Sequence, residues 1–168
     1  MTKVPILSFN GKKGEIFKLI LEKKSGNGRL YLDSNLCLNA DAYKSVRTAF
    51  ALVRPKTNIL IRNTNRKCKP ICGGSLGLPI YLGMYALTHD LKMNSKAFAT
   101  GFLDIKGKVE RIGSLAEKIK AALGKGELIL VPRDQGIPVK GIRVLEVGTA
   151  KEAVKILFNV RKSGDKKR

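Results

Sequence analysis

The chain has 168 residues, of which 43% are hydrophobic, and its 33 Lys and Arg against 13 Asp and Glu give a net charge of +20. This length fits one domain with an ordinary core, and no apolar run reaches the roughly 18 residues that a membrane-spanning helix needs. So large a positive charge predicts attraction to a polyanion, a nucleic acid first and an anionic lipid surface second, unless it serves only solubility.

Eight segments have the apolar or alternating patterns of strands. In chain order they are residues 4–8, 15–22, 29–32, 58–62, 96–105, 109–112, 127–131 and 143–147. The second of them also allows a helix. Asn27-Gly28, between the second and the third, predicts a hairpin turn, and Gly101 marks a bulge or a close contact within the fifth.

Four segments carry the signals of helices. In chain order they are residues 42–54, 76–89, 115–123 and 150–158. Asn39 or Asp41 can cap the first helix, Ser114 and Glu117 match a capping box for the third, and Thr149 can cap the fourth. No linker is long enough to separate domains, so we expect one domain over residues 1–160.

The cysteines are odd in number and irregular in spacing, at Cys37, Cys68 and Cys72. This pattern predicts reduced thiols rather than a disulfide framework. The chain has one histidine, His89, so we expect no metal site. Residues 1–5 lack the long apolar segment of a secretory signal, and we therefore expect a cytoplasmic protein.

Glycine and serine are concentrated in Cys72-Gly73-Gly74-Ser75-Leu76-Gly77, directly before the most apolar predicted helix. Glycines allow sharp turns and close approach, and free amides at a helix N-terminus favour negative charge. A serine placed there can attack a carbonyl while the amides receive the oxyanion. The same residues also fit a simple Gly-Ser turn that begins a core helix.

Lys118 is the second candidate residue, on the predicted helix 115–123. It lies beside the apolar face formed by Leu115, Ile119 and Ala122. Burial at the edge of this face would lower the pKa of the lysine and leave a neutral amine to act as a base. The alternative is a surface lysine whose stem packs on the helix while its amine reaches water.

The spacing of these motifs resembles that of the Lon protease proteolytic domain, a family that uses a serine–lysine dyad. The family lysine, in a segment like Ile-Gly-Gly-Leu-Lys-Glu-Lys, follows the serine by 43 residues, as in Ile112-Gly113-Ser114-Leu115-Ala116-Glu117-Lys118. Thr100-Gly101 followed by Gly107-Lys108-Val109 is similar to a third family element. The likeness covers about residues 4–158, although Cys72 and Gly74 replace an aspartate and a proline of the family's serine motif.

The resemblance implies an α+β fold like that of the Lon proteolytic domain, with mixed sheets, three to four packed helices and an N-terminal β-hairpin lobe. It implies a serine endopeptidase that cleaves unfolded or flexible proteins through an acyl-enzyme and needs no cofactor. The nucleophile is then Ser75, the base is Lys118, Thr100 holds the lysine amine, and the amides at Gly73 and Gly74 receive the oxyanion.

Two further expectations concern the wider assembly. The sequence contains no Gly-x-x-x-x-Gly-Lys-Ser/Thr motif, so we expect an ATP-independent enzyme. The family resemblance implies a homo-oligomer, a ring of six subunits, which the high positive charge would oppose unless anions bridge the subunits.

A second function class remains open because of the charge. In it, the chain is a catalytically inactive Lon-like module that binds nucleic acid or forms a structural part of a nucleoprotein assembly. Few aromatic residues interleave with the basic segments, so phosphate contact is expected rather than base stacking. We also expect residues 161–168 to be a basic, disordered tail. The candidate contacts are Arg62, Arg66, Lys67, Lys69, Arg161 and Lys162.

Overall fold

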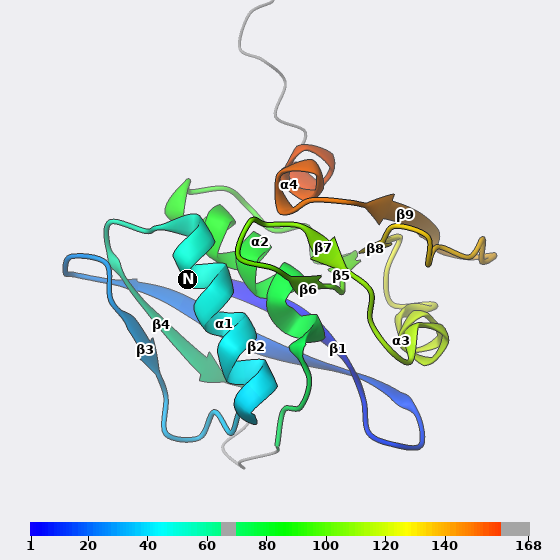
Figure 1. Ribbon diagram of the computed structural model, residues 1–168, viewed down its shortest axis with the longest axis horizontal. Coiled ribbons are helices and arrows are strands. Elements are labelled where there is room, and N and C mark those ends of the chain that lie inside the picture. The colour runs from blue at the N-terminus through cyan, green and yellow to red at the C-terminus, as the bar shows by residue number, and fades with distance from the viewer. Residues whose placement is uncertain (65–69, 159–168) are drawn as a thin grey trace, which may run out of the picture.

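The structure, a computed structural model, describes residues 1–64 and 70–158, and its largest sheet has four strands in the order β1-β2-β4-β3 (Figure 1). Neighbouring strands β1, β2 and β4 run antiparallel, whereas β3 pairs with β4 in parallel. The bounds of these strands are Thr2–Phe9 (β1), Gly14–Lys24 (β2), Leu30–Leu32 (β3) and Asn58–Asn63 (β4).

The hairpin lobe is formed by β1 and β2, and the hairpin predicted at Asn27-Gly28 is wrong. Strand β4 lies between β2 and β3, so the chain after β2 opens into a wider loop. Asn58 bridges this loop, because its Nδ2 donates to the Ser25 carbonyl at 2.8 Å and its Oδ1 accepts from the Arg29 amide at 2.9 Å. The local turn signal was overridden by the long-range pairing of β4.

Helices α1 (Ala40–Val53) and α2 (Gly77–Thr88) pack together, and α2 also packs on β1 and β2 (Figure 1). This arrangement explains why α2 is apolar on all sides, since ten of its twelve residues are buried. The predicted cap of α1 is confirmed at Asn39, whose side chain accepts from the Ala42 amide. A helix of this composition is stable only inside such a core.

Helix α2 approaches the sheet closely at Gly83. A Cβ atom there would lie 2.3 Å from Val4 Cγ2 and 3.3 Å from Leu21 Cδ2, and Val4 is fully buried. We expect Gly83→Ala to destabilise the protein by about 1–2 kcal/mol, because overpacking outweighs the better helix propensity of alanine. Urea unfolding checks this.

The matched control for Gly83→Ala is the double variant that also carries Val4→Ala, which removes the clashing methyl groups. We expect the double variant to be more stable than the sum of the two single effects predicts. Strict additivity of the two changes in unfolding free energy would contradict the proposed contact.

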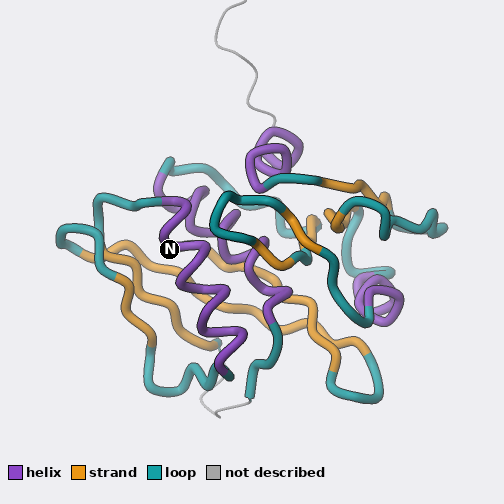
Figure 2. Tube along the Cα trace, viewed as in Figure 1, coloured by secondary structure: helices purple, strands orange, loops and turns teal. Residues whose placement is uncertain are grey.

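The second half of the chain forms a parallel sheet in the order β5-β8-β9 and a separate pair of short strands, β6 and β7. The long strand predicted at residues 96–105 is interrupted at Thr100 and Gly101. Figure 2 shows the short strands beside the helices. The bounds are Ala97–Ala99 (β5), Phe102–Leu103 (β6), Val109–Glu110 (β7), Leu128–Pro132 (β8) and Arg143–Val147 (β9).

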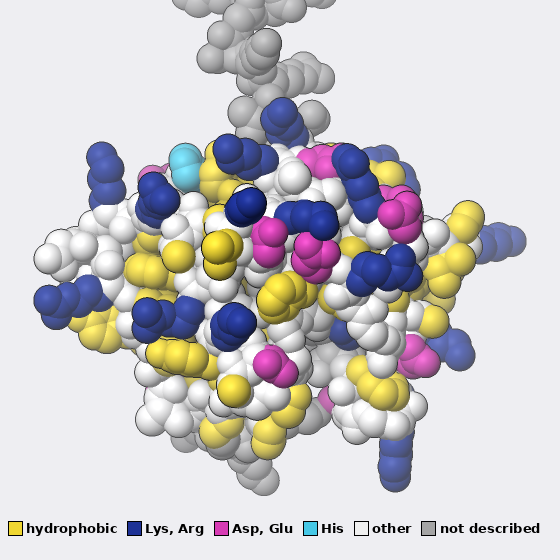
Figure 3. All heavy atoms as spheres, viewed as in Figure 1, with side chains coloured by type: hydrophobic (Ala, Val, Ile, Leu, Met, Phe, Trp, Pro, Cys, Tyr) yellow, Lys and Arg dark blue, Asp and Glu magenta, His cyan; other side chains and the backbone are white. Residues whose placement is uncertain are grey.

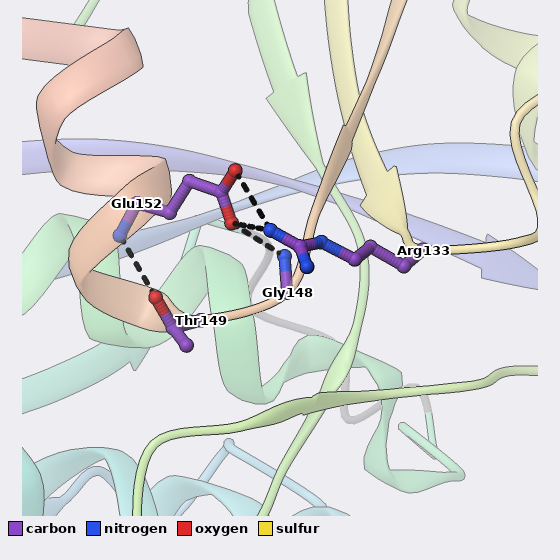
Figure 4. Close-up of polar contacts among 4 residues, drawn as sticks. All are labelled: Arg133, Gly148, Thr149 and Glu152. Atoms are coloured by element: carbon purple, nitrogen blue, oxygen red, sulfur yellow. Dashed lines mark hydrogen bonds and ion pairs between the residues drawn. The ribbon is translucent and has the colours of Figure 1, made fainter.

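Helix α4 (Ala150–Phe158) begins where the sequence predicts. Thr149 Oγ1 accepts from the Glu152 amide at 3.1 Å, which confirms the cap (Figure 4). The Glu152 carboxylate in turn accepts from the Gly148 amide at 2.8 Å and from Arg133 at 3.2 Å. Hydrogen bonding, first from the Gly148 amide, holds the pKa of Glu152 below its usual value.

The start of helix α3 (Leu115–Ala122) differs from the prediction. Ser114 has φ 54° and ψ 37°, in the left-handed region, and its side chain makes no capping hydrogen bond. The capping box expected from Ser114 and Glu117 is therefore wrong. An N-cap side chain reaches the helix amides from an extended backbone, which the left-handed conformation of Ser114 does not provide.

The cysteines also differ in part from the expectation. Cys37 takes part in a disulfide, whereas Cys72 is a free and exposed thiol. The prediction of reduced thiols is therefore wrong at Cys37. The segment of Cys37 lies against the segment that contains Ile71, because the Ile71 amide donates to the Cys37 carbonyl at 2.8 Å.

None of the helices in residues 1–64 and 70–158 is long and apolar enough to cross a bilayer.

Candidate active site

Ser75 lies in a single 3-10 turn, Gly74–Leu76, which leads directly into α2. The Ser75 carbonyl accepts from the Gly101 amide at 2.9 Å, and the Gly101 carbonyl accepts from the Leu78 amide at 3.0 Å. The break between β5 and β6 therefore supplies the backbone groups that hold the serine turn. This explains why a predicted continuous strand stops at Thr100 and Gly101.

Gly74 permits an approach that no other residue would allow. A Cβ atom at Gly74 would lie 2.5 Å from the Phe102 ring and 2.9 Å from Ser45 Oγ. The Ser45 hydroxyl is fully buried on α1 and donates to the Gly74 carbonyl at 3.0 Å. Helix α1 thus fixes the backbone directly before Ser75.

Asn39 connects the start of α1 with the serine loop. Its Oδ1 accepts from the Ala42 amide at 2.9 Å and from the Gly73 amide at 3.3 Å. The Gly73 amide, one of the two expected oxyanion donors, is therefore already engaged. The amides of Gly74 and Ser75 begin the 3-10 turn, and the first amides of a helix have no acceptor within it.

Lys118 reaches the serine from α3, 43 residues further along the chain. Its Nζ donates to Ser75 Oγ at 2.8 Å. Helix α3 is held against the first hairpin at Gly14, where a Cβ atom would lie 2.0 Å from the Glu117 carbonyl oxygen. The sequence could not show which way Lys118 points, and the structure brings the two predicted side chains together.

The Lys118 side chain is buried, with 5% of the residue exposed. Burial lowers the pKa of the amine from its usual 10.5 to about 8, because the charged form loses its hydration. No carboxylate among the described residues forms an ion pair with it. A large fraction of the amine is therefore neutral at mildly alkaline pH, as a general base requires.

A cavity of about 360 Å³ opens beside these two side chains. Its lining includes Arg111 and Lys118 as the charged residues, and no carboxylate lines it among the described residues. The space is sufficient for a few residues of an extended peptide. The other lining residues are Ser8, Phe9, Cys72, Gly73, Gly74, Ser75, Phe102, Ile112, Gly113 and Ser114.

Thr100 is buried beside the serine turn, but it does not make the expected contact with Lys118. Its residue is 1% exposed, and its Oγ1 has no hydrogen-bond partner. Lys118 Nζ is directed to Ser75 instead. The predicted role of Thr100 in holding the amine stays a prediction.

Of the nucleic-acid residues predicted from the sequence, Arg62 lies within the described residues, and it does not line the cavity beside Ser75. Arg62 is paired with Glu22, through Nη2 to Oε1 at 2.7 Å and Nε to the same oxygen at 2.9 Å. Hydrogen bonds from Lys24 and then Arg62 hold the pKa of Glu22 below its usual value. Arg62 is therefore engaged by a carboxylate. The other candidates, Arg66, Lys67, Lys69, Arg161 and Lys162, lie outside the described residues.

Two supporting residues were missed by the sequence reasoning. Ser45 is a fully buried polar residue within the apolar face of α1, a signal that could have identified it. Gln135 holds the rim of the cavity, because it donates to the Ile112 carbonyl at 2.9 Å and accepts from the Ile112 amide at 2.8 Å. No sequence pattern pointed to Gln135. Within the described residues, no group of His, Cys, Asp and Glu could hold a metal ion.

Comparison with known proteins gives distant similarity to Lon proteases. The chain is 25% identical to an archaeal Lon protease of Methanocaldococcus jannaschii over 94% of its own length and 27% of that protein. It is 28% identical to the Lon protease of Campylobacter jejuni, over 76% of this chain and 19% of that protein. Lon protease 2 of Bacillus subtilis is 31% identical, over 54% of this chain and 17% of that protein.

These similarities point to a Lon-related domain, and the mixed α/β structure is compatible with that relationship. The chain spans between 17% and 27% of the length of these relatives. No family model matches the chain.

Proposed function

We propose that the chain is a serine endopeptidase that works through a Ser75–Lys118 dyad and forms an acyl-enzyme. The similarity to Lon proteases supports a protease-related function. The observation that carries the finer proposal is the 2.8 Å separation of Lys118 Nζ and Ser75 Oγ at the wall of a cavity.

The first step is the attack of Ser75 Oγ on a substrate carbonyl. Neutral Lys118 takes the hydroxyl proton while the new C–O bond forms, since its Nζ lies 2.8 Å from Ser75 Oγ, a distance that allows direct proton transfer. The amides of Gly74 and Ser75 receive the oxyanion. Donors of this kind each stabilise the transition state by about 3–4 kcal/mol.

The second step releases the two products in turn. Protonated Lys118 gives its proton to the leaving amine as the peptide C–N bond breaks, which leaves an ester on Ser75. Water then attacks this ester while Lys118 accepts a proton from the water. The ester C–Oγ bond breaks as Lys118 returns that proton to Ser75 Oγ, which releases the second product with its new carboxyl group and restores the dyad. The cavity of about 360 Å³ has room for only a few residues of backbone, so a flexible chain suits it better than a folded one.

A covalent probe tests the nucleophile directly. The protein is treated with a fluorophosphonate, which forms an ester with an activated serine hydroxyl, and the labelled peptide is identified by mass spectrometry. We expect the label on Ser75 and not on Ser8 or Ser114, although all three residues line the cavity. Cleavage of casein by the same preparation gives the activity.

The matched variant for this experiment is Ser75→Ala, which should lose both the label and the cleavage. Labelling of Ser114 or Ser8, or cleavage of casein by Ser75→Ala at the parent rate, would overturn the assignment of the nucleophile.

A further inference from the structure

A second hollow, distinct from the active-site cavity, lies between α1, the turn from β6 to β7 and the start of α4. Its volume is about 610 Å³, and it shares no residue with the cavity beside Ser75. We call it the α1 groove and define it by its five basic residues. They are Lys44, Arg47, Arg54, Lys106 and Lys151.

The charge of the α1 groove is of one sign. No Asp or Glu lines it, and its five basic residues are exposed and form no ion pair with a described carboxylate. Asp104, two residues before Lys106, does not line the groove. Its carboxylate accepts hydrogen bonds from the amides of Lys106 and Lys108, each at 2.8 Å. Figure 3 shows dark blue side chains over α1, with few magenta ones among them.

Three of the five basic residues form a stripe along α1 and its C-terminal end. Lys44 and Arg47 are three residues apart on the face of α1 opposite the buried residues Ala42 and Val46. Arg54 is the C-cap residue directly after the helix, and it lines the same groove. At 1.5 Å per residue, the stripe is about 15 Å long. One strand of a duplex places a phosphate roughly every 3.4 Å along the axis, so about four phosphates fit beside it.

We propose that the α1 groove binds the phosphodiester backbone of a nucleic acid, without reading its sequence. The groove is concave, so a sugar–phosphate strand can enter it, whereas a flat lipid surface cannot reach its floor. Arginine forks match phosphate oxygens. Tyr43 lies beside Arg47, with the guanidinium carbon 5.9 Å from the ring centre. Because its ring is already in contact with Arg47, we expect phosphate contacts in this groove rather than base stacking. The net charge of +20 supplies long-range attraction.

The test is the salt dependence of binding to a fluorescein-labelled 20-base-pair DNA duplex, measured by anisotropy. Each phosphate contact contributes about −0.9 to the slope of log K against log salt concentration. We expect the triple variant Arg47→Glu, Arg54→Glu, Lys106→Glu to bind at least about tenfold more weakly and to reduce the slope by about three. The neutral triple variant with glutamine at the same positions should reduce the slope equally.

The matched control carries the same change of charge on another hollow, Lys12→Glu, Lys13→Glu, Lys120→Glu, which also contains Glu117. We expect it to change affinity less than about threefold and to keep the slope. Equal losses of DNA affinity in both triple variants would show that binding depends on the total charge rather than on a particular site, and would overturn the proposal.

Two other outcomes would also overturn it. One is the absence of duplex binding by the parent protein at low salt. The other is equal or tighter binding, lost in the same triple variant, to vesicles of anionic phospholipid or to polyglutamate, because the groove would then serve a membrane or an acidic protein. The binding readout is independent of proteolysis, since the groove shares no lining residue with the cavity beside Ser75 and Lys118.

Discussion

Replacing Lys118 by methionine is expected to lower kcat/KM for a casein-derived peptide by at least about a thousandfold. Methionine keeps most of the buried volume but cannot accept the Ser75 proton, and general-base catalysis contributes about 10²–10⁴ by itself. Loss of the serine's activated state should also abolish fluorophosphonate labelling. A variant that retained more than about a tenth of the activity would exclude Lys118 as the base.

The same variant is expected to be more stable than the parent. The Lys118 amine has a pKa of about 8 in the folded protein against 10.5 ordinarily, which corresponds to about 3 kcal/mol of destabilisation at neutral pH. Loss of the hydrogen bond to Ser75 offsets about 1 kcal/mol of this, so we expect a net gain of about 2 kcal/mol.

The matched control is Lys120→Met on the same helix, where the lysine is exposed. This variant should leave kcat/KM unchanged, and it should change the free energy of unfolding by no more than about 0.5 kcal/mol. If both variants gained the same stability, the gain would come from helix charge rather than from the relief of a buried amine.

The pH dependence of activity is the second large effect. Only neutral Lys118 can accept the proton, and burial sets its pKa at about 8. We expect kcat/KM to rise about tenfold for each pH unit below 8 and to level off above about 9, which amounts to nearly a hundredfold between pH 6 and 9. Initial rates on one peptide across this range check it.

The control for this profile is the Cys72→Ser background, because it removes the thiol that lines the same cavity. The pH dependence of folding stability gives an independent test of the lowered pKa of Lys118. Between pH 8 and 10.5 the unfolded chain keeps a proton on Lys118 that the folded chain has lost, so stability should rise with pH there. A profile unchanged by pH between 6 and 8 would contradict the assignment of the base.

The sequence predicted most elements because their local signals agree with their environments. The cap at Asn39, the strand at Arg143–Val147 and the helix after Thr149 all lie where expected. Each is defined by residues within a few positions of one another. The apolar run of α2 was also sufficient to predict that the helix is buried, and ten of its twelve residues are buried.

The prediction failed at the hairpin turn and at the cap of α3, and at the hairpin a distant segment decided the outcome. Asn27-Gly28 has the chemistry of a tight hairpin, but β4 enters between the two flanking strands and Asn58 takes the polar groups of the loop. At Ser114, the backbone conformation that starts α3 lies outside what the capping pattern assumes. Neither effect can be read from neighbouring residues.

The candidate site also combines features that the local sequence predicted with features that distant contacts decide. The spacing of Ser75 and Lys118 was visible in the sequence, but their 2.8 Å contact depends on how α3 packs on the hairpin. The support from Ser45 and Gln135 involves side chains bonded to backbone groups more than twenty residues away. The proposed oxyanion donors differ from those expected from the sequence because Asn39 accepts from the Gly73 amide, a contact that no motif indicates.

The close packing of Gly14 against the Glu117 carbonyl has a consequence for the order in which the protein becomes active. A chain emerging from the ribosome contains Ser75 well before Lys118, and the helix that carries the lysine is oriented by the hairpin made first. Under the proposed mechanism, peptide cleavage is therefore possible only after Lys118 has been brought to Ser75. Under the proposed mechanism, a nascent or partly unfolded copy carries Ser75 without its base and cannot cleave its neighbours.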